Sequence, residues 1–239
     1  WAGGEFDDNG GKVVNHNVAV VRRRIDYNSH GWYDPDGHLY YLEDEGDPDA
    51  RPGPKEPLFF RAQHGQILNL TLTNALPAEI EGTAYDLPFP PCPALPWEGE
   101  CSMHVHMVKF DPVCADGGSV GWNYISAPRI GRRFVYRWWA DQEFGTIFFH
   151  DHLFANYRQK HGLFGALIVE PIGAQFLDAF SDGEIVSGLQ ARIHVPNGNP
   201  QRFREFCIAI GDFIPMFDRH GAALNPPDHP GGHGDQGAM

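Results

Sequence analysis

Short apolar runs, separated by turns rich in glycine and proline, make up most of the chain. The clearest run is ILNLTLTN at residues 67–74, in which leucines alternate with asparagine and threonine. Successive side chains of a β-strand point to opposite faces of a sheet, so this alternation predicts a strand with one apolar and one polar face. The run LFFRAQ lies just before it, beyond a turn at Gly65, and together they predict a hairpin over 58–76.

Similar runs predict further strands along the chain. They lie at 12–28, 38–42, 103–110, 132–140, 146–153 and 163–171, where Pro171 ends the last one. Asp-Pro, Asp-Gly and Pro-Gly-Pro steps around 38–42 predict turns on both sides of that short strand. The stretch FANYRQKHG at 154–162 predicts one helical turn or a loop. With 28 Gly and 20 Pro among 239 residues, the whole pattern favours an all-β sandwich.

The apolar pattern also divides the chain into three parts. Residues 1–52 are predicted to form an N-terminal extension with leading strands, and 53–172 the main sandwich domain. Apolar runs become sparse after Pro171. We therefore expect 173–239 to hold a linker and the start of a second, incomplete domain, whose first strand begins in the apolar run at 203–217.

Charge and hydropathy narrow the class of protein. The chain carries 18 Lys and Arg against 31 Asp and Glu, a formal net charge of −13, which argues against a nucleic-acid partner. No apolar stretch approaches the ~18–20 residues needed to span a bilayer. The chain begins with Trp1 and shows no basic-then-apolar leader. We expect either a removed leader or an internal piece of a longer protein, and an extracytoplasmic or secreted location.

The four cysteines do not form a metal-binding motif of their own. None of them has CxxC spacing, which argues against a zinc ribbon. Four cysteines allow three complete disulfide pairings, and the sequence does not choose among them. A bond between Cys92 and Cys101 is favoured because these residues flank a proline-rich loop.

Two His-x-His pairs carry the strongest chemical signal. One pair is His104 and His106 in MHVHMVKF, and the other is His150 and His152 in TIFFHDHL. Residues i and i+2 of a strand share a face, roughly 6.5–7 Å apart, so each pair points to one side. If the two strands are close, four imidazoles converge. Imidazole suits copper, zinc, iron or nickel, and four imidazoles without a thiolate or carboxylate suit a site with several ions.

Other metal and hydrolytic sites fit the sequence less well. A zinc hydrolase needs a general base beside the metal, and Asp151 is expected to point to the opposite face from its two neighbouring histidines. A cupin-type iron or manganese site wants a carboxylate on the same face, and no residue supplies it. A Ser-His-Asp triad is not supported because the chain has no Gly-x-Ser-x-Gly elbow.

The stretch MHVHMVKFD, the following ADGGSVGWN and the later FGTIFFHDHLFANYRQKHGLFGALIVEP resemble the first cupredoxin domain of multicopper oxidases. The earlier FRAQHGQILNLTLTNALP is similar to the opening strand pair of that family. The resemblance is closest to the large bacterial oxidases, a group that includes metal- and manganese-oxidising members. It implies a cupredoxin-like Greek-key β-sandwich over 53–172, with a second cupredoxin-like domain beginning after it.

The resemblance also assigns roles to individual residues. It implies that His104 binds a type 2 copper and that His106, His150 and His152 bind a type 3 copper pair. Asp116, in ADGG, matches an acid that assists proton delivery. The remaining four histidines of such a trinuclear centre come from another domain, so the chain is expected to be inactive alone.

The implied activity belongs to the assembled oxidase. It is the one-electron oxidation of a substrate, a phenol or a metal ion such as Mn(II), coupled to the four-electron reduction of dioxygen to water. The chain has no Cys-containing type 1 copper motif of its own, so the expected partners are the remaining cupredoxin domains, dioxygen and the reducing substrate. The alternative left open is a non-catalytic copper-binding or assembly module.

Overall fold

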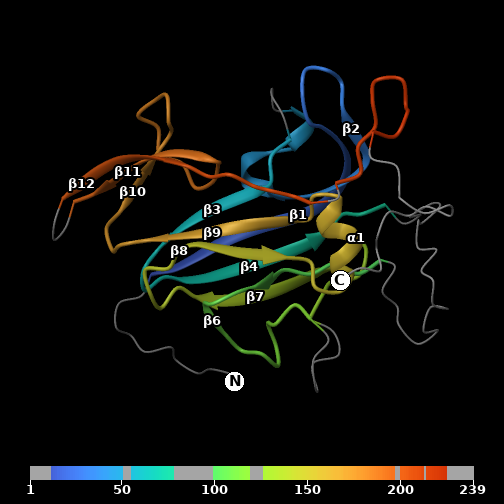
Figure 1. Ribbon diagram of the computed structural model, residues 1–239. Coiled ribbons are helices and arrows are strands. Elements are labelled where there is room, and N and C mark those ends of the chain that lie inside the picture. The colour runs from blue at the N-terminus through green and yellow to red at the C-terminus, as the bar shows by residue number, and fades with distance from the viewer. Residues whose placement is uncertain are drawn as a thin grey trace.

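The chain folds almost entirely into β-strands. The computed structural model describes residues 12–50, 55–77, 99–118, 126–196, 200–212 and 214–224. Within these ranges the strands form a five-stranded sheet, a four-stranded sheet and a smaller three-stranded sheet (Figure 1).

The five-stranded sheet has the order β2-β1-β4-β7-β6. β1 and β4 run parallel, and the other neighbours are antiparallel. Its strands are β1 (Val13–Asp26), β2 (Tyr33–Leu42), β4 (Ile67–Asn74), β6 (Lys109–Phe110) and β7 (Arg133–Trp139).

The four-stranded sheet has the order β3-β9-β8-β5, and it holds both His-x-His segments. β3 and β9 run parallel, whereas β8 is antiparallel to both β9 and β5. Its strands are β3 (Leu58–Gln63), β5 (His104–Val105), β8 (Gly145–His150) and β9 (Phe164–Glu170), with the short helix α1 (Ala155–Lys160) between the last two.

The two larger sheets pack face to face over one apolar core. Phe60 of β3 stacks on Trp138 of β7, with ring centroids 6.2 Å apart, and Phe149 of β8 lies against both rings. All three side chains are fully buried. Large aromatic rings that interlock across a sandwich supply much of its apolar burial. The predicted all-β sandwich is confirmed, and both of its larger sheets are mixed.

The predicted hairpin over 58–76 is wrong in its pairing, although both strands exist. β3 and β4 belong to different sheets. Gly65, at φ +85°, turns the chain from one layer of the sandwich to the other, a conformation that glycine adopts without steric cost. Alternation fixes which face of a strand is buried, but not which strand lies beside it.

The single strand predicted over 103–110 is divided into two short strands. β5 and β6 lie in different sheets, and Met107 between them has a left-handed backbone at φ +66°. The predicted strand over 146–153 ends at His150, so His152 lies beyond it. FANYRQKHG contains the helical turn α1.

The turn predicted from Asp34 to Gly37 is wrong, because these residues lie inside the edge strand β2. Their polar side chains are paired there, with Asp34 bound to His161 and Asp36 to Arg22. A proline such as Pro35 is tolerated on an edge strand, where a missing N–H removes no ladder bond.

The segment expected to be a linker contains the three-stranded sheet. This sheet is formed by β10 (Gln175–Leu177), β11 (Gln190–Val195) and β12 (Gln201–Phe206). A small core of Ala174, Ala191, Ile193 and Val195 supports it. The apolar run after β12 is not a strand in the described residues, and Ile208 and Ile210 are exposed. The domain boundaries stay a prediction.

Two 3₁₀ turns, η1 (Glu43–Glu45) and η2 (Pro48–Ala50), follow β2. Cys101, Cys114 and Cys207 are free, which contradicts the favoured bond between Cys101 and Cys92; Cys92 itself lies outside the described residues. None of the described helices has the length and apolar character needed to cross a membrane.

Close packing between β9 and its neighbours predicts a sensitive glycine. A Cβ on Gly165 would lie 2.2 Å from the carbonyl oxygen of Leu58 and 2.4 Å from a ring carbon of Phe149. We expect Gly165→Ala to lower the free energy of unfolding by about 1–3 kcal/mol, measured by urea denaturation. Gly183→Ala is the control, because its Cβ would meet nothing closer than 3.4 Å. Equal stability of the two variants would contradict this packing.

His38 predicts an acid-sensitive fold. It is buried, neither ring nitrogen has a hydrogen-bond partner in the described part of the chain, and burial above all lowers its pKa from 6.5 to about 3. In the unfolded chain His38 takes up a proton near pH 6.5, whereas in the folded chain it stays neutral down to about pH 3. The free energy of unfolding therefore decreases as the pH falls from about 6.5 towards 3.

We expect this histidine alone to remove on the order of 3 kcal/mol of stability between pH 7 and pH 4. His38→Leu should flatten that part of the pH profile of urea unfolding. His30→Leu alters an exposed histidine and should not. A profile for His38→Leu as steep as that of the unaltered chain would show that His38 is not the acid-sensitive group.

Candidate metal centre

The two His-x-His pairs converge where β5 and β8 pair. His104 lies directly opposite His150 in the antiparallel register, and the backbone N–H of His106 donates to the carbonyl of Phe148 at 3.1 Å. The centroids of the His104 and His152 rings are 4.6 Å apart, and His150 lies 5.2 Å from His106 and 5.6 Å from His152. The structure therefore brings all four predicted imidazoles into one cluster, which we call the imidazole cluster.

The imidazole cluster lies at the surface of the sandwich, and its members differ in exposure. His150 is buried and His104 half-buried, whereas His106 and His152 are exposed. Burial, reinforced by the neighbouring imidazoles, lowers the pKa of His106 and of His150 below 6.5. Both rings are therefore neutral near pH 7, which is the state that binds a metal.

Two of the rings have their Nδ1 atoms held by backbone carbonyls. Nδ1 of His104 lies 2.6 Å from the carbonyl oxygen of Asp116, and Nδ1 of His150 lies 2.7 Å from that of Asp151. A carbonyl oxygen only accepts hydrogen bonds, so each Nδ1 carries the proton and each Nε2 keeps a lone pair. Such a partner on the other nitrogen is the usual support of a metal-binding histidine.

The Nε2 atoms of His106 and His150 lie within hydrogen-bonding distance of each other, and they are close enough to share an ion. Nε2 of His106 and Nε2 of His150 are 3.1 Å apart. With imidazole–metal bonds of about 2.0–2.1 Å, two nitrogens at this separation can both reach one ion. A donor set of imidazoles alone fits copper. In the described ranges, no three His, Cys, Asp or Glu side chains are arranged around a single ion position.

Asp116, the predicted acid, lies beside the imidazole cluster. Its carboxylate is 3.6 Å from Nδ1 of His104, and its Oδ2 accepts a hydrogen bond from the N–H of Gly118 at 3.0 Å. A Cβ on Gly118 would lie 2.7 Å from that Oδ2 and 3.0 Å from Nδ1 of His152. Glycine at this position therefore leaves room for both the carboxylate and the imidazole. The proton-delivering role of Asp116 stays a prediction.

A buried polar network joins the two histidine segments behind the imidazole cluster. The carboxylate of Asp151 accepts hydrogen bonds from the backbone N–H groups of Ser102 and Phe154, at 2.8 and 2.7 Å. The hydroxyl of Ser102 accepts the N–H of His152 at 2.9 Å. Asp151 thus faces away from the imidazole cluster, as expected, and it connects the strand end at β8 to the segment before β5.

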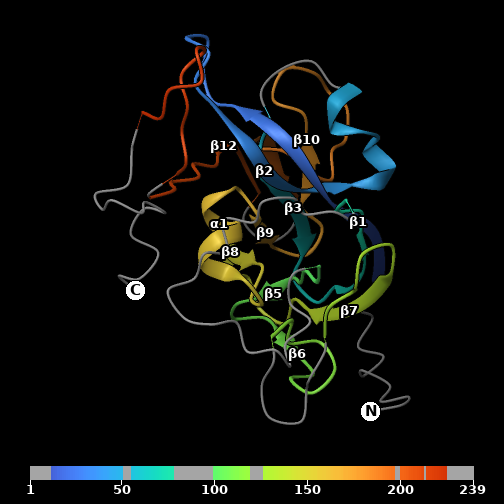
Figure 2. The same cartoon turned by 90° about the vertical axis from the view of Figure 1, so that its right-hand side faces the viewer.

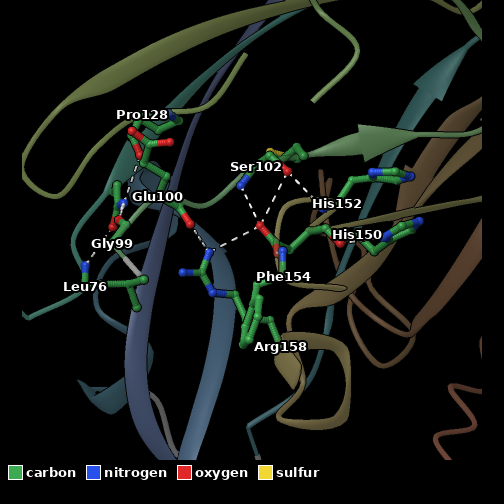
Figure 3. A network of polar contacts seen from close by, with 12 residues as sticks. Leu76, Gly99, Glu100, Ser102, Pro128, His150, His152, Phe154 and Arg158 are labelled. Carbon is green, nitrogen blue, oxygen red and sulfur yellow. Dashed lines mark hydrogen bonds and ion pairs between the residues drawn. The ribbon is translucent and has the colours of Figure 1, made fainter. Parts of the chain in front are cut away.

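Arg158 of α1 completes this network, which we call the Asp151 network. Its guanidinium lies 3.3 Å from the Asp151 carboxylate and also donates to the carbonyl of Glu100. Both charged side chains are fully buried. Figure 3 shows the rings of His150 and His152 projecting away from Arg158. In Figure 2 the viewer looks onto the side of the molecule where α1 and β5 are labelled.

Sequence reasoning missed the residues of this network. Ser102 and Arg158 belong to no sequence motif. For Asp151, between the two histidines, the sequence predicts only that its carboxylate points away from them and is not a general base. Two buried tyrosines were missed as well. The hydroxyl of Tyr40 donates to the carbonyl of Ser102, and that of Tyr136 accepts the N–H of Met103 at 3.3 Å. They support the backbone just before His104.

Comparison with known proteins identifies the histidine-bearing segment. Residues 97–173, which contain both His-x-His pairs, match the family model described as multicopper oxidase. The match shows that this segment is similar to a domain of multicopper oxidases. A search of curated proteins found no match.

Three solved structures resemble parts of the chain. A multicopper oxidase from Pseudomonas thermotolerans is 18% identical with a TM-score of 0.44, covering 67% of this chain and 30% of its own. A second multicopper oxidase is 22% identical with a TM-score of 0.44, covering 69% of this chain and 45% of its own. A copper nitrite reductase from Nitrosomonas europaea is 18% identical with a TM-score of 0.42, covering 68% and 43%. The chain spans less than half the length of each.

The Asp151 network predicts a large loss of stability when its cation is removed. Arg158→Met leaves the Asp151 carboxylate buried without its ion-pair partner, so we expect the free energy of unfolding to fall by about 3–5 kcal/mol. Guanidinium denaturation of the metal-free protein measures it.

Arg24→Met is the matched control. Arg24 pairs with Asp26 at 2.8 Å, and both side chains are at least half exposed, so its removal should cost about 0–1 kcal/mol. If both arginine variants lost the same small amount, the Asp151 network would not hold the two histidine segments together.

Proposed function

We propose that this chain supplies half of the histidines of a trinuclear copper centre in a multicopper oxidase. The assembled enzyme would couple the one-electron oxidation of a substrate to the four-electron reduction of dioxygen to water. The observation that carries the proposal is the convergence of four imidazoles from β5, β8 and the bend after β8, with Nε2 of His106 and of His150 only 3.1 Å apart.

The partly open imidazole cluster supports a shared site. His106 and His152 are exposed, as are the apolar side chains of Met107 and Phe148 beside them. Exposed apolar side chains around polar groups are typical of a surface that another protein surface covers. The remaining cupredoxin domains of the oxidase, in another chain or fragment, would supply the other four histidines and the type 1 copper. The chain alone would then be inactive.

The geometry and the family pattern together assign the four histidines to different copper ions. His106 and His150 would share one type 3 ion, because their Nε2 atoms face each other at 3.1 Å. His152 would hold the second type 3 ion, and His104 the type 2 ion. Copper supplies the one-electron redox chemistry. The protein holds the four rings at fixed spacing, keeps each bound nitrogen unprotonated and, through Asp116 beside His104, provides an acid for proton delivery.

The reducing substrate would bind near the type 1 copper, outside this chain. The proposed classes are phenols and metal ions such as Mn(II). A formal net charge of −13 favours a cation, because an acidic surface concentrates cations around it. We also propose an extracytoplasmic or secreted location, where such substrates are met.

Copper titration of the metal-free chain tests the proposal. We expect one tight copper site with nitrogen ligands. Equilibrium dialysis measures its affinity, and paramagnetic resonance identifies the ligand atoms. The double variant His106→Ala/His150→Ala removes two facing ligands and should weaken this site at least about 100-fold.

The control is His229→Ala/His233→Ala, which removes tail histidines able to bind copper adventitiously. This control should keep the tight site and its spectrum. Copper binding that followed the tail histidines, or a preference for a single zinc or iron ion, would overturn the proposed trinuclear role.

A further inference from the structure

The side chain of Gln159 reaches the imidazole cluster from behind. The Gln159 amide, by its Nε2 end, lies 2.9 Å from Nδ1 of His150. The same Nδ1 lies 2.7 Å from the carbonyl oxygen of Asp151. One ring nitrogen therefore has two polar neighbours on the side away from His106.

The chemistry of these neighbours decides where the proton of His150 lies. A backbone carbonyl cannot donate, so the contact with Asp151 requires the proton on Nδ1. An amide N–H facing that N–H would be repulsive. The structure places the Nε2 end of the Gln159 amide at Nδ1. The two ends of a carboxamide have nearly the same shape, and the hydrogen-bond partners decide between them, so the contact with the Asp151 carbonyl calls for the flipped amide, with Oε1 at Nδ1.

We propose that Gln159 is a positioning residue that fixes the tautomer and ring orientation of His150. Its amide oxygen and the Asp151 carbonyl together hold the proton on Nδ1, so the lone pair lies on Nε2, facing Nε2 of His106. The opposite arrangement, with Gln159 donating to Nδ1, would put the proton on Nε2 and block the ligand atom. This inference rests on the proposed copper-binding role of the imidazole cluster.

The helix that carries Gln159 is anchored on both sides. Tyr157 donates from its hydroxyl to Asp36 of β2, and Arg158 binds Asp151 and the Glu100 carbonyl. Tyr157, Arg158 and Gln159 of α1 thus contact the five-stranded sheet, the Asp151 network and the imidazole cluster, respectively. Partners that orient a metal-binding histidine work only when their own position is fixed.

Long-range proton–nitrogen NMR of the metal-free chain, labelled at histidine with nitrogen-15, reads the tautomer directly. We expect His150 to be protonated at Nδ1. Gln159→Met has similar length but no acceptor, so the form protonated at Nε2 should become populated and the affinity for the first copper should fall by about tenfold. Gln159→Glu keeps an acceptor and should restore both the tautomer and the affinity.

Gln142→Met, at an exposed position between β7 and β8, is the control and should change neither readout. Thermal unfolding of each variant shows that the fold is intact. The inference is overturned if His150 of the unaltered chain is protonated at Nε2, or if Gln159→Met keeps the tautomer and the affinity. Because the spectrum is recorded without copper, it decides the role of Gln159 even if copper binding fails, which would instead overturn the proposed function.

Discussion

The buried ion pair between Asp151 and Arg158 is the interaction on which the imidazole cluster depends. Asp151 gathers backbone N–H groups from Ser102 and Phe154, and Arg158 binds the segment before β5 from the opposite side. Two charges without solvent contact are tolerated only when several hydrogen bonds satisfy them. The pair therefore fixes the distance between two chain segments that are far apart in sequence, and each segment carries one His-x-His pair.

From this constraint the chemistry of the surface follows. The acid between the two histidines is turned inward, so its neighbours His150 and His152 turn outward together. Backbone carbonyls then hold the Nδ1 atoms of His104 and His150, which leaves the Nε2 lone pair of each ring available. We propose that these nitrogens bind ions that are shared with another protein surface.

The sequence predicts the general fold and the clustering of the four histidines better than it predicts which strands pair. Alternation and the strand-ending Pro171 located β4 and β9, and the spacing of the histidine pairs predicted their convergence. Periodicity could not show that β3 and β4 lie in different sheets, or that Met107 breaks the strand after His106, because these depend on long-range packing. Arg158 and Gln159 carry no local signal, since their roles arise only when α1 folds back on β8.

The metal content of the protein as isolated, together with any chains that co-purify, tests the central claim most directly. The account predicts about four copper ions per assembled unit, with a blue thiolate band from a type 1 copper elsewhere and a type 2 paramagnetic signal. Copper without a blue band would favour a copper-binding or assembly module over an oxidase. One zinc or iron ion per chain, with no copper, would contradict the claim that these four histidines are half of a shared copper centre.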